Sequence, residues 1–401
     1  MNNVPPLDLS RQYALIGDEV SVAVLDVLAS GRYIGGPAVA SFEESFAGYI
    51  GVSESVGCNS GTDALFLALR ALKIGPGDEV ITTPFTFVAT AEMITAVGAK
   101  PIFVDIKAET FNLDLDKLEA AITSRTRAIM PVHLFGQPVD MTRLMAIAQA
   151  HDLAVIEDCA QSTGAEWAGQ KVGSIGHVGC FSFFPTKNLG ACGDGGAVTT
   201  NDPAIAATVR MLKEHGQSAR YLSQEVGINS RLDALQATIL QIKLRYLDTW
   251  NSQRRAAADR YHQLLSPLPG LVLPQELPGG KGVWNQYTIS LKSQEKSNSL
   301  PPAPPLPCSP APHLPISPHR DLVRSKLQES GVGSMVYYPL PLHLQPVYKS
   351  LDYQQGSFPI AEQAGCEVLS LPIFPEISRD QQDRVVYGLK DCLSSLAEFF
   401  D

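Results

Sequence analysis

The run Gly179-Cys-Phe-Ser-Phe-Phe-Pro-Thr-Lys187-Asn-Leu-Gly190 joins an apolar, strand-like stretch to a loop that opens with a single lysine. Similar short apolar runs recur from about Ser55 to about Thr200 and alternate with helical patterns. This alternation is typical of a mostly parallel sheet that helices cover on both faces. The predicted strands are Glu79-Val-Ile-Thr-Thr83, Pro101-Ile-Phe-Val-Asp-Ile106, Arg127-Ala-Ile-Met-Pro-Val132, Leu153-Ala-Val-Ile-Glu157, Gly179-Cys-Phe-Ser-Phe183 and Gly196-Ala-Val-Thr-Thr200.

Helices are predicted between these strands. Leu144, Ile147 and Ala148 have the spacing of one helix face, which places a helix within 140–151. Asn201-Asp-Pro predicts another helix start, with Asp202 as the cap and Pro203 in the first turn. Both segments are interpreted as packing elements of an α/β sheet domain.

The remainder of the chain predicts a second, smaller α+β domain. A helical pattern over 232–265 leads out of the large domain, which we expect to span 1–245 and to include the N-terminal segment. Over 246–401 we expect a strand at 287–291 and helices near 321–330 and 380–400. Nine of the eighteen residues in 301–318 are proline, which neither joins a sheet ladder nor continues a helix. We therefore interpret 300–319 as an exposed loop, a solvated insertion rather than a motif for a proline-binding partner.

Composition excludes several classes of protein. The 401 residues are 45% hydrophobic and 18% charged, which indicates a compact globular protein. A formal net charge of −10 argues against a nucleic-acid binder. Seven cysteines without a CxxC pair favour buried reduced thiols over disulfides or a metal site, and a cytoplasmic protein. The sequence shows neither a signal peptide at its start nor an apolar run of membrane-spanning length.

Three polar groups each follow an apolar run and together fit one cofactor. Pyridoxal phosphate needs a lysine amine for an imine bond, a carboxylate opposite its ring nitrogen and an anion site for its phosphate. Lys187 fits the first role and Asp158, which ends Leu153-Ala-Val-Ile-Glu-Asp158, fits the second. Ser60-Gly61-Thr62 fits the third, because backbone N–H groups and two hydroxyls meet there at the predicted start of a helix.

Simpler interpretations remain beside these roles. Asp158 would also serve as a capping carboxylate, and Ser60 is an ideal helix cap. Phe87 would stack on a flat ring or simply belong to the core. His133 and His215 lie in settings where histidine is usually structural, so neither is assigned to catalysis. The usual glycine-rich motifs for dinucleotides and for P-loop nucleotides are absent from the sequence.

Five motifs in order resemble the sugar aminotransferases of the DegT/DnrJ/EryC1/StrS family. They are Asn59-Ser-Gly-Thr-Asp-Ala-Leu65, Glu157-Asp-Cys-Ala-Gln-Ser162, Phe181-Ser-Phe-Phe-Pro-Thr-Lys187, Gly193-Asp-Gly-Gly-Ala197 and Gly227-Ile-Asn-Ser-Arg-Leu-Asp233. The resemblance runs from the N-terminus to near Pro372. It implies an aspartate-aminotransferase-like (type I) fold and a homodimer with active sites at the interface. It also implies transfer of an amino group, usually from glutamate, to a keto group of a nucleotide-linked sugar.

The resemblance also implies a role for each matching position. Lys187 would form the imine with pyridoxal 5'-phosphate and move the proton at the cofactor carbon, and Asp158 would pair with the ring nitrogen. Gln161 would bond the ring hydroxyl and Phe87 would stack on the ring. Two further sets complete the site. Ser60, Gly61, Thr62 and Ser182 would surround the phosphate, and Asn229 would reach it from the other subunit.

Substrate-side candidates follow from the same resemblance. Arg231 offers a guanidinium for an anionic nucleotide sugar, although an ordinary salt bridge explains it equally well. Tyr338 and His343 lie in a segment that resembles the one closing over the sugar. The loop 188–197 resembles the branch that acts on 3-oxo sugars, and most closely the enzymes that aminate UDP-linked 3-oxo uronic acids. The proline-rich insert departs from the family pattern, which puts substrate closure in doubt rather than cofactor chemistry.

Two other functions are compatible with this fold. A sugar dehydratase on the same scaffold usually replaces the lysine by histidine, so Lys187 speaks against that function. A sensory or regulatory protein would keep the fold for binding without turnover. Retention of the lysine, the aspartate and the phosphate motif together is hard to explain for such a protein without a cofactor.

Overall fold

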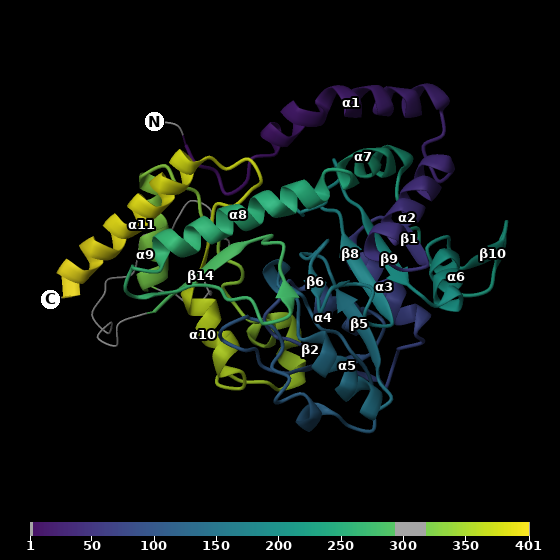
Figure 1. Ribbon diagram of the computed structural model, residues 1–401. Helices are drawn as coiled ribbons and strands as arrows, with labels where there is room; N and C mark the ends of the chain where they lie inside the picture. The colour runs from purple at the N-terminus through teal and green to yellow at the C-terminus, as the bar shows by residue number, and fades with distance from the viewer. Residues whose placement is uncertain (1–2, 293–317, 401) are drawn as a thin grey trace.

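A seven-stranded sheet forms the centre of the large domain (Figure 1). This computed structural model describes residues 3–292 and 318–400, so the predicted proline-rich loop lies outside it except at its last two residues. The strands of the sheet are β1 Glu54–Cys58, β2 Glu79–Thr82, β3 Lys100–Phe103, β4 Thr126–Ile129, β5 Ala154–Asp158, β8 Val178–Ser182 and β9 Gly196–Thr200. Their order is β1-β9-β8-β5-β4-β2-β3, and β9 alone runs antiparallel to its neighbours. The predicted mostly parallel sheet is confirmed.

Helices cover both faces of this sheet. They are α2 Pro37–Ile50, α3 Gly61–Ala71, α4 Ala89–Ala96, α5 Met141–Ala150, α6 Pro203–Leu212 and α7 Ala234–Leu244. One face packs against α3, α4 and α6, and the other packs against α2, α5 and α7. Successive residues of a strand point to opposite faces, so Val80 and Ile81 belong to different hydrophobic clusters. Asp202 caps α6 as predicted, accepting hydrogen bonds from the backbone of Ala204 and Ile205.

A smaller α+β unit follows in the chain. Helix α8 (Leu247–Leu265) leads from the large sheet to this unit, as Figure 1 shows. The unit is built on β12 Leu271–Val272, β14 Tyr287–Leu291 and β15 Val368–Leu371, with α9 Pro318–Glu329, α10 Pro359–Glu367 and α11 Arg379–Phe400 around them. The predicted strand and both predicted helices are therefore confirmed.

Shorter elements connect these parts. Three two-residue strands, β6 Glu166–Trp167, β7 Gln170–Lys171 and β13 Gly280–Lys281, form a small sheet. A hairpin is formed by β10 Gln217–Ala219 and β11 Leu222–Ser223. The short 3-10 helices are η1 Glu119–Ala121, η2 Leu134–Gly136, η3 Leu342–Leu344 and η4 Pro346–Leu351.

The first residues of the chain do not pack where the sequence placed them. We expected the N-terminal segment to belong to the large domain, but Val4 lies fully buried in the core of the smaller unit. Its backbone forms a parallel bridge with Val332 and hydrogen bonds with Gly331 and Gly333. The buried apolar side chain and these backbone bonds explain this placement. Helix α1 (Leu9–Ser30) then crosses to the large domain and packs on α7.

Four described cysteines are buried thiols, and none of the six described cysteines forms a disulfide. They are Cys58, Cys159, Cys180 and Cys392; Cys192 is exposed and Cys366 is intermediate. Cys308 lies outside the described residues. Within 3–292 and 318–400, no helix combines the length and the hydropathy that a membrane crossing requires.

Asp105 links the two units at the end of β3. Its carboxylate is 3% exposed and accepts hydrogen bonds from the backbone nitrogens of Ile106 (2.9 Å), Ile360 (3.2 Å) and Ala361 (3.0 Å). The last two residues lie in the first turn of α10, whose own N-cap residue Phe358 provides no side-chain bond. Asp105 therefore caps a helix of the other unit.

We expect Asp105→Ala to lower the free energy of unfolding by about 2 kcal/mol, since it removes a cap and leaves buried N–H groups without an acceptor. Urea unfolding followed by circular dichroism measures this value. The matched control is Asp140→Ala. Asp140 caps α5 within the large domain by accepting a bond from Arg143 and should cost about 1 kcal/mol. An equal or smaller loss for the Asp105 variant contradicts the cross-domain role.

Candidate active site

The carboxyl ends of three strands meet at one edge of the large sheet. Strands β1, β8 and β5 run in the same direction, because β9 is antiparallel to both β1 and β8 and β5 is parallel to β8. The register places Cys58 opposite Gly196, and Gly196 opposite Ser182. Asp158 pairs with Cys180 on the neighbouring strand. The sheet thus brings the predicted phosphate motif, Ser182 and Asp158 to a common edge, where ligands of open α/β sheets bind.

Asp158 is a buried carboxylate held by two donors. It is 4% exposed, and its Oδ2 accepts a hydrogen bond from Thr90 Oγ1 at 2.8 Å, while its Oδ1 accepts one from Ala160 N at 3.1 Å. Burial raises the pKa of Asp158, and the two hydrogen bonds and the charge of Lys187 oppose that rise. The ionised form of Asp158 is therefore stabilised by these neighbouring groups.

Lys187 lies in the loop after β8, at the same edge. Its backbone N–H donates to Phe184 O at 2.9 Å, and the residue is partly exposed. Burial of the ammonium lowers the pKa of Lys187 to about 8, and the negative charge of Asp158 acts against this shift. A lysine with such a pKa is partly neutral near pH 7, as a nucleophilic amine must be.

The predicted phosphate site is the N-terminus of α3. Ser60 is the N-cap residue and its Oγ accepts a bond from Asp63 N at 3.1 Å. A Cβ atom at Gly61 would lie 2.6 Å from Ser182 Cβ, so only glycine allows the two backbones to approach this closely. The helix end, with Thr62 in its first turn, presents backbone N–H groups and hydroxyls to an anion.

Gln161 and Tyr338 connect this edge to the smaller unit. Gln161 Oε1 accepts a hydrogen bond from Phe135 N at 2.7 Å, and Gln161 Nε2 donates to the Tyr338 hydroxyl at 3.1 Å. The rings of Phe87 and Tyr338 lie 6.4 Å apart, and Phe87 is 56% exposed. An aromatic side chain with half its surface free is available for stacking, so Phe87 is not part of the core within this chain.

Three predicted residues are not brought into this group within the single chain. Asn229 is exposed and pairs through its backbone with Glu214. Arg231 Nε donates to Glu214 Oε2 at 2.7 Å, which corresponds to the ordinary salt bridge that we weighed for it. His343 is 2% exposed, and its Nε2 lies 3.0 Å from Glu362 Oε1. Burial lowers the pKa of His343 while Glu362 opposes the shift, so the buried imidazole is held within the smaller unit.

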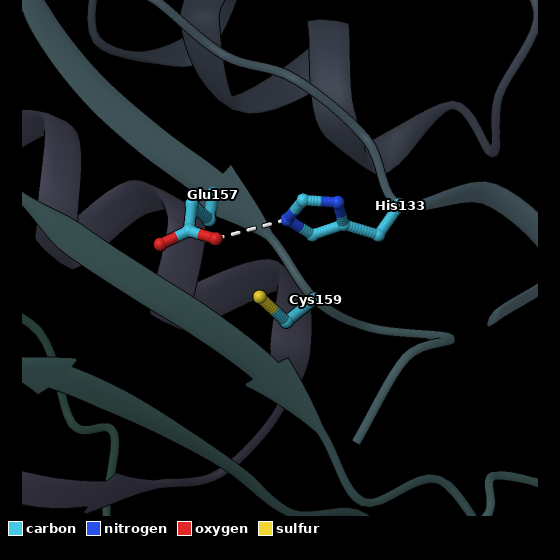
Figure 2. A group of neighbouring side chains, drawn as sticks. All are labelled: His133, Glu157 and Cys159. Carbon is cyan, nitrogen blue, oxygen red and sulfur yellow. Dashed lines mark hydrogen bonds and ion pairs between the residues drawn. The ribbon is translucent and has the colours of Figure 1, made fainter. Parts of the chain in front are cut away.

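A buried group behind the site contains His133, which the sequence analysis interprets as structural, and two residues to which it gave no role of this kind, Glu157 and Cys159. His133, Glu157 and Cys159 lie close together below the sheet edge (Figure 2). Glu157 accepts four hydrogen bonds, from His133 Nε2 (3.0 Å) and from the backbone nitrogens of residues 173 (2.9 Å), 175 (2.9 Å) and 176 (2.6 Å). His133 Nδ1 accepts a bond from Val139 N at 3.1 Å.

These bonds show what the cluster does. Because Nδ1 of His133 is an acceptor, Nε2 carries the proton and donates to Glu157. Both imidazole nitrogens and both carboxylate oxygens already have partners, so the group is not arranged to hold a metal ion. The backbone N–H of His133 also donates to Asp158 O at 3.1 Å, which fixes the strand end that carries Asp158. The only sequence signal was an acidic residue directly before Asp158 in a strand buried on both faces.

The chain is similar to known proteins over nearly its whole length. The sequence model of the DegT/DnrJ/EryC1/StrS aminotransferase family matches residues 15–300 and 313–390. A pleiotropic regulatory protein of Geobacillus stearothermophilus is 46% identical over 99% of both chains. A UDP-N-acetyl-3-dehydro-alpha-D-glucosamine 3-aminotransferase of Acidithiobacillus ferrooxidans is 44% identical over 97% of this chain and 98% of its own.

A solved structure shows the same fold. The crystal structure of S. venezuelae DesV, in complex with a ketimine intermediate, superposes with a TM-score of 0.90 at 41% identity and covers 98% of this chain and 99% of its own. The family model spans most of the chain, and both relatives match over nearly their full length. The chain therefore belongs to the DegT/DnrJ/EryC1/StrS aminotransferase family.

Proposed function

We propose that this chain uses pyridoxal 5'-phosphate to transfer an amino group from an amino acid, glutamate, to the C3 keto group of a nucleotide-linked sugar. The observation that carries the proposal is the convergence of Lys187, Asp158 and the α3 N-terminus at one sheet edge. Membership of an aminotransferase family supports the reaction class. The match to a 3-aminotransferase of a UDP-sugar supports the substrate class and the position of transfer.

The residues at this edge fit the cofactor chemically. The close approach of Gly61 to Ser182 forms a cradle at a helix N-terminus, which suits a phosphate dianion. Asp158 offers a buried negative charge for a protonated ring nitrogen. Gln161 is bonded to Tyr338 and would hold the ring hydroxyl from the side, and the half-exposed ring of Phe87 would cover one face.

The cofactor supplies an aldehyde carbon and a protonated ring that withdraws electrons from the bond being broken. Lys187 Nζ would hold the cofactor through its aldehyde carbon and, when free, would accept and release a proton beside it. A pKa of about 8 suits an amine that gains and loses a proton near neutral pH. Asp158 would favour the protonated ring nitrogen through its charge and hydrogen bonding.

A homodimer with shared active sites would complete the phosphate site through the partner subunit's Asn229. The exposure of Asn229 agrees with this role. The turn of the hairpin β10–β11 exposes Tyr221 (84%), and the segment after the hairpin exposes Val226 (82%). Exposed apolar side chains near Asn229 in the chain support an interface there. Arg231 lies on the same segment. It would leave its salt bridge with Glu214 and pair with the anionic nucleotide sugar instead.

A regulatory function is the second candidate, because the Geobacillus stearothermophilus relative is named as a regulatory protein. Such a protein would bind a sugar nucleotide and transfer no amino group. The partly neutral amine of Lys187 opposite the buried Asp158 favours turnover, since binding alone requires neither.

Substitution of Lys187→Ala should abolish the covalent link to the cofactor. The wild-type protein should show a visible absorbance band that glutamate bleaches, and borohydride should fix the cofactor to one peptide. In the variant, borohydride should attach none, as mass spectrometry of the digested protein would show. Lys171→Ala is the control, since that lysine pairs with Glu166 at the small sheet and should leave labelling intact. A Lys187→Ala chain that is still labelled at this site refutes the assignment.

The rate at which apoprotein captures pyridoxal phosphate should depend on pH through Lys187. Only the neutral amine attacks, so the rate constant should rise about tenfold per pH unit below a pKa of about 8 and level off above it. Stopped-flow absorbance measures this profile, with N-acetyl-lysine amide as the free-amine control. A rate constant that levels off only near the pKa of the free-amine control would contradict a pKa of Lys187 lowered by burial.

A panel of UDP- and dTDP-linked sugars, each with a keto group at C3 or C4, tests the function directly. With cofactor and glutamate present, we expect an amino sugar and 2-oxoglutarate from a 3-oxo substrate, detected by mass spectrometry. Release of product only from 4-oxo sugars would contradict the position of transfer. Tight binding of a sugar nucleotide without any amino transfer would favour the regulatory function.

A further inference from the structure

Two buried threonines next to the site have no predicted role. Thr90 is 1% exposed and Thr86 is 4% exposed, and they lie at the start of α4 and in the turn before it. We propose that Thr90 is a positioning residue of the cofactor site, whose hydroxyl, backed by that of Thr86, keeps the Asp158 carboxylate ionised and directed toward the ring nitrogen. This inference rests on the proposed function, because the ring is that of pyridoxal phosphate.

Thr86, Thr90 and Asp158 form a chain of hydrogen bonds, and an ionised Asp158 gives this chain one direction. Thr86 Oγ1 lies 3.1 Å from Thr90 Oγ1, and Thr90 Oγ1 lies 2.8 Å from Asp158 Oδ2. An ionised carboxylate only accepts hydrogen bonds, so Thr90 must donate to Asp158. The Thr90 oxygen then accepts, and Thr86 must donate to it. Protonation of Asp158 at Oδ2 would reverse the bond between Thr90 and Asp158. The chain in this direction therefore matches the ionised acid.

The donors at Asp158 leave room for a ring nitrogen. Each carboxylate oxygen has one protein donor, Thr90 for Oδ2 and Ala160 N for Oδ1. An ionised carboxylate accepts about four hydrogen bonds, so further lone pairs stay free for an N–H group of the ring. The two existing bonds fix the rotation of the carboxyl group before the cofactor binds.

Electrostatics gives the same role to the Thr90 hydroxyl. Burial raises the pKa of Asp158, and the hydrogen bond from Thr90 is the largest effect that opposes the rise, ahead of the bond from Ala160. The positive charge of Lys187 acts in the same direction as the Thr90 hydrogen bond. Burial raises the pKa values of Tyr338, Cys159 and Cys180 around Asp158, and the negative charge of Asp158 adds to that rise.

The threonine side chains are not explained by packing alone. Valine has nearly the same shape and would fill these buried positions without a polar group that needs a partner. Thr86 and Thr90 are four residues apart and flank Phe87, the candidate stacking residue. One short segment would therefore provide the stacking side chain for the face of the ring and, through Asp158, fix the protonation of the ring nitrogen.

The test is the protonation state of the bound cofactor. Wild-type protein and the variants Thr90→Val and Thr90→Ser are loaded with pyridoxal phosphate labelled with ¹⁵N in the ring, and the nitrogen resonance is measured. We expect a protonated-ring resonance in wild type and in T90S. In T90V the resonance should shift toward unprotonated pyridine. T90V should also bind the cofactor about tenfold more weakly, the effect of losing one hydrogen bond to a charged group.

Two further variants make the outcome decisive. Thr95→Val removes another hydroxyl of α4, which donates to Ala91 O at 3.1 Å and makes no bond to Asp158, so it should leave resonance and affinity unchanged. Thr86→Val should shift the resonance in the same direction by less, and it carries the test if T90V does not fold. A loaded T90V or T86V with the wild-type resonance and affinity overturns this inference alone. A wild-type chain that binds no pyridoxal phosphate overturns the proposed function as well.

Discussion

The site depends on one pair of opposite charges that share a poorly solvated edge of the sheet. Asp158 ends strand β5, and Lys187 lies in the loop after the neighbouring strand β8. Burial shifts the pKa of each group in the direction that favours its neutral form. The charge of each group opposes the pKa shift of the other group. The amine of Lys187, with a pKa lowered to about 8, can therefore gain and lose a proton near neutral pH, which is the property that proton transfer at a cofactor requires.

The rest of the large domain serves to hold this pair in place. The buried Glu157 collects four hydrogen bonds behind the sheet, and His133 donates both to Glu157 and to the backbone of Asp158. The glycine at position 61 lets α3 approach β8 so closely that a helix N-terminus faces the same edge. Tyr338 of the smaller unit accepts a hydrogen bond from Gln161 of the large domain. Asp105 of the large domain caps α10 of the smaller unit. Hydrogen bonds at two separate places therefore join the two units.

The sequence predicted what depends on local pattern. Alternating apolar runs gave the parallel sheet, and because parallel strands end at one edge, Ser60, Asp158 and Lys187 could be expected together. Thr90 and Glu157 were missed, since their roles arise from side-chain directions that no periodicity encodes. The place of Val4 was wrong, because a single apolar residue cannot specify a partner more than three hundred positions away. Arg231 and His343 could not be separated from ordinary ion pairs by residue type alone.

The placement of Val4 beside Val332 also bears on how the chain is made. During synthesis the amino-terminal residues leave the ribosome first, but the core that receives Val4 includes Val385 and Leu389 near the other end. That core cannot close until Val385 and Leu389 have been translated, more than three hundred residues after Val4. Val4 therefore reaches its native position long after its own synthesis.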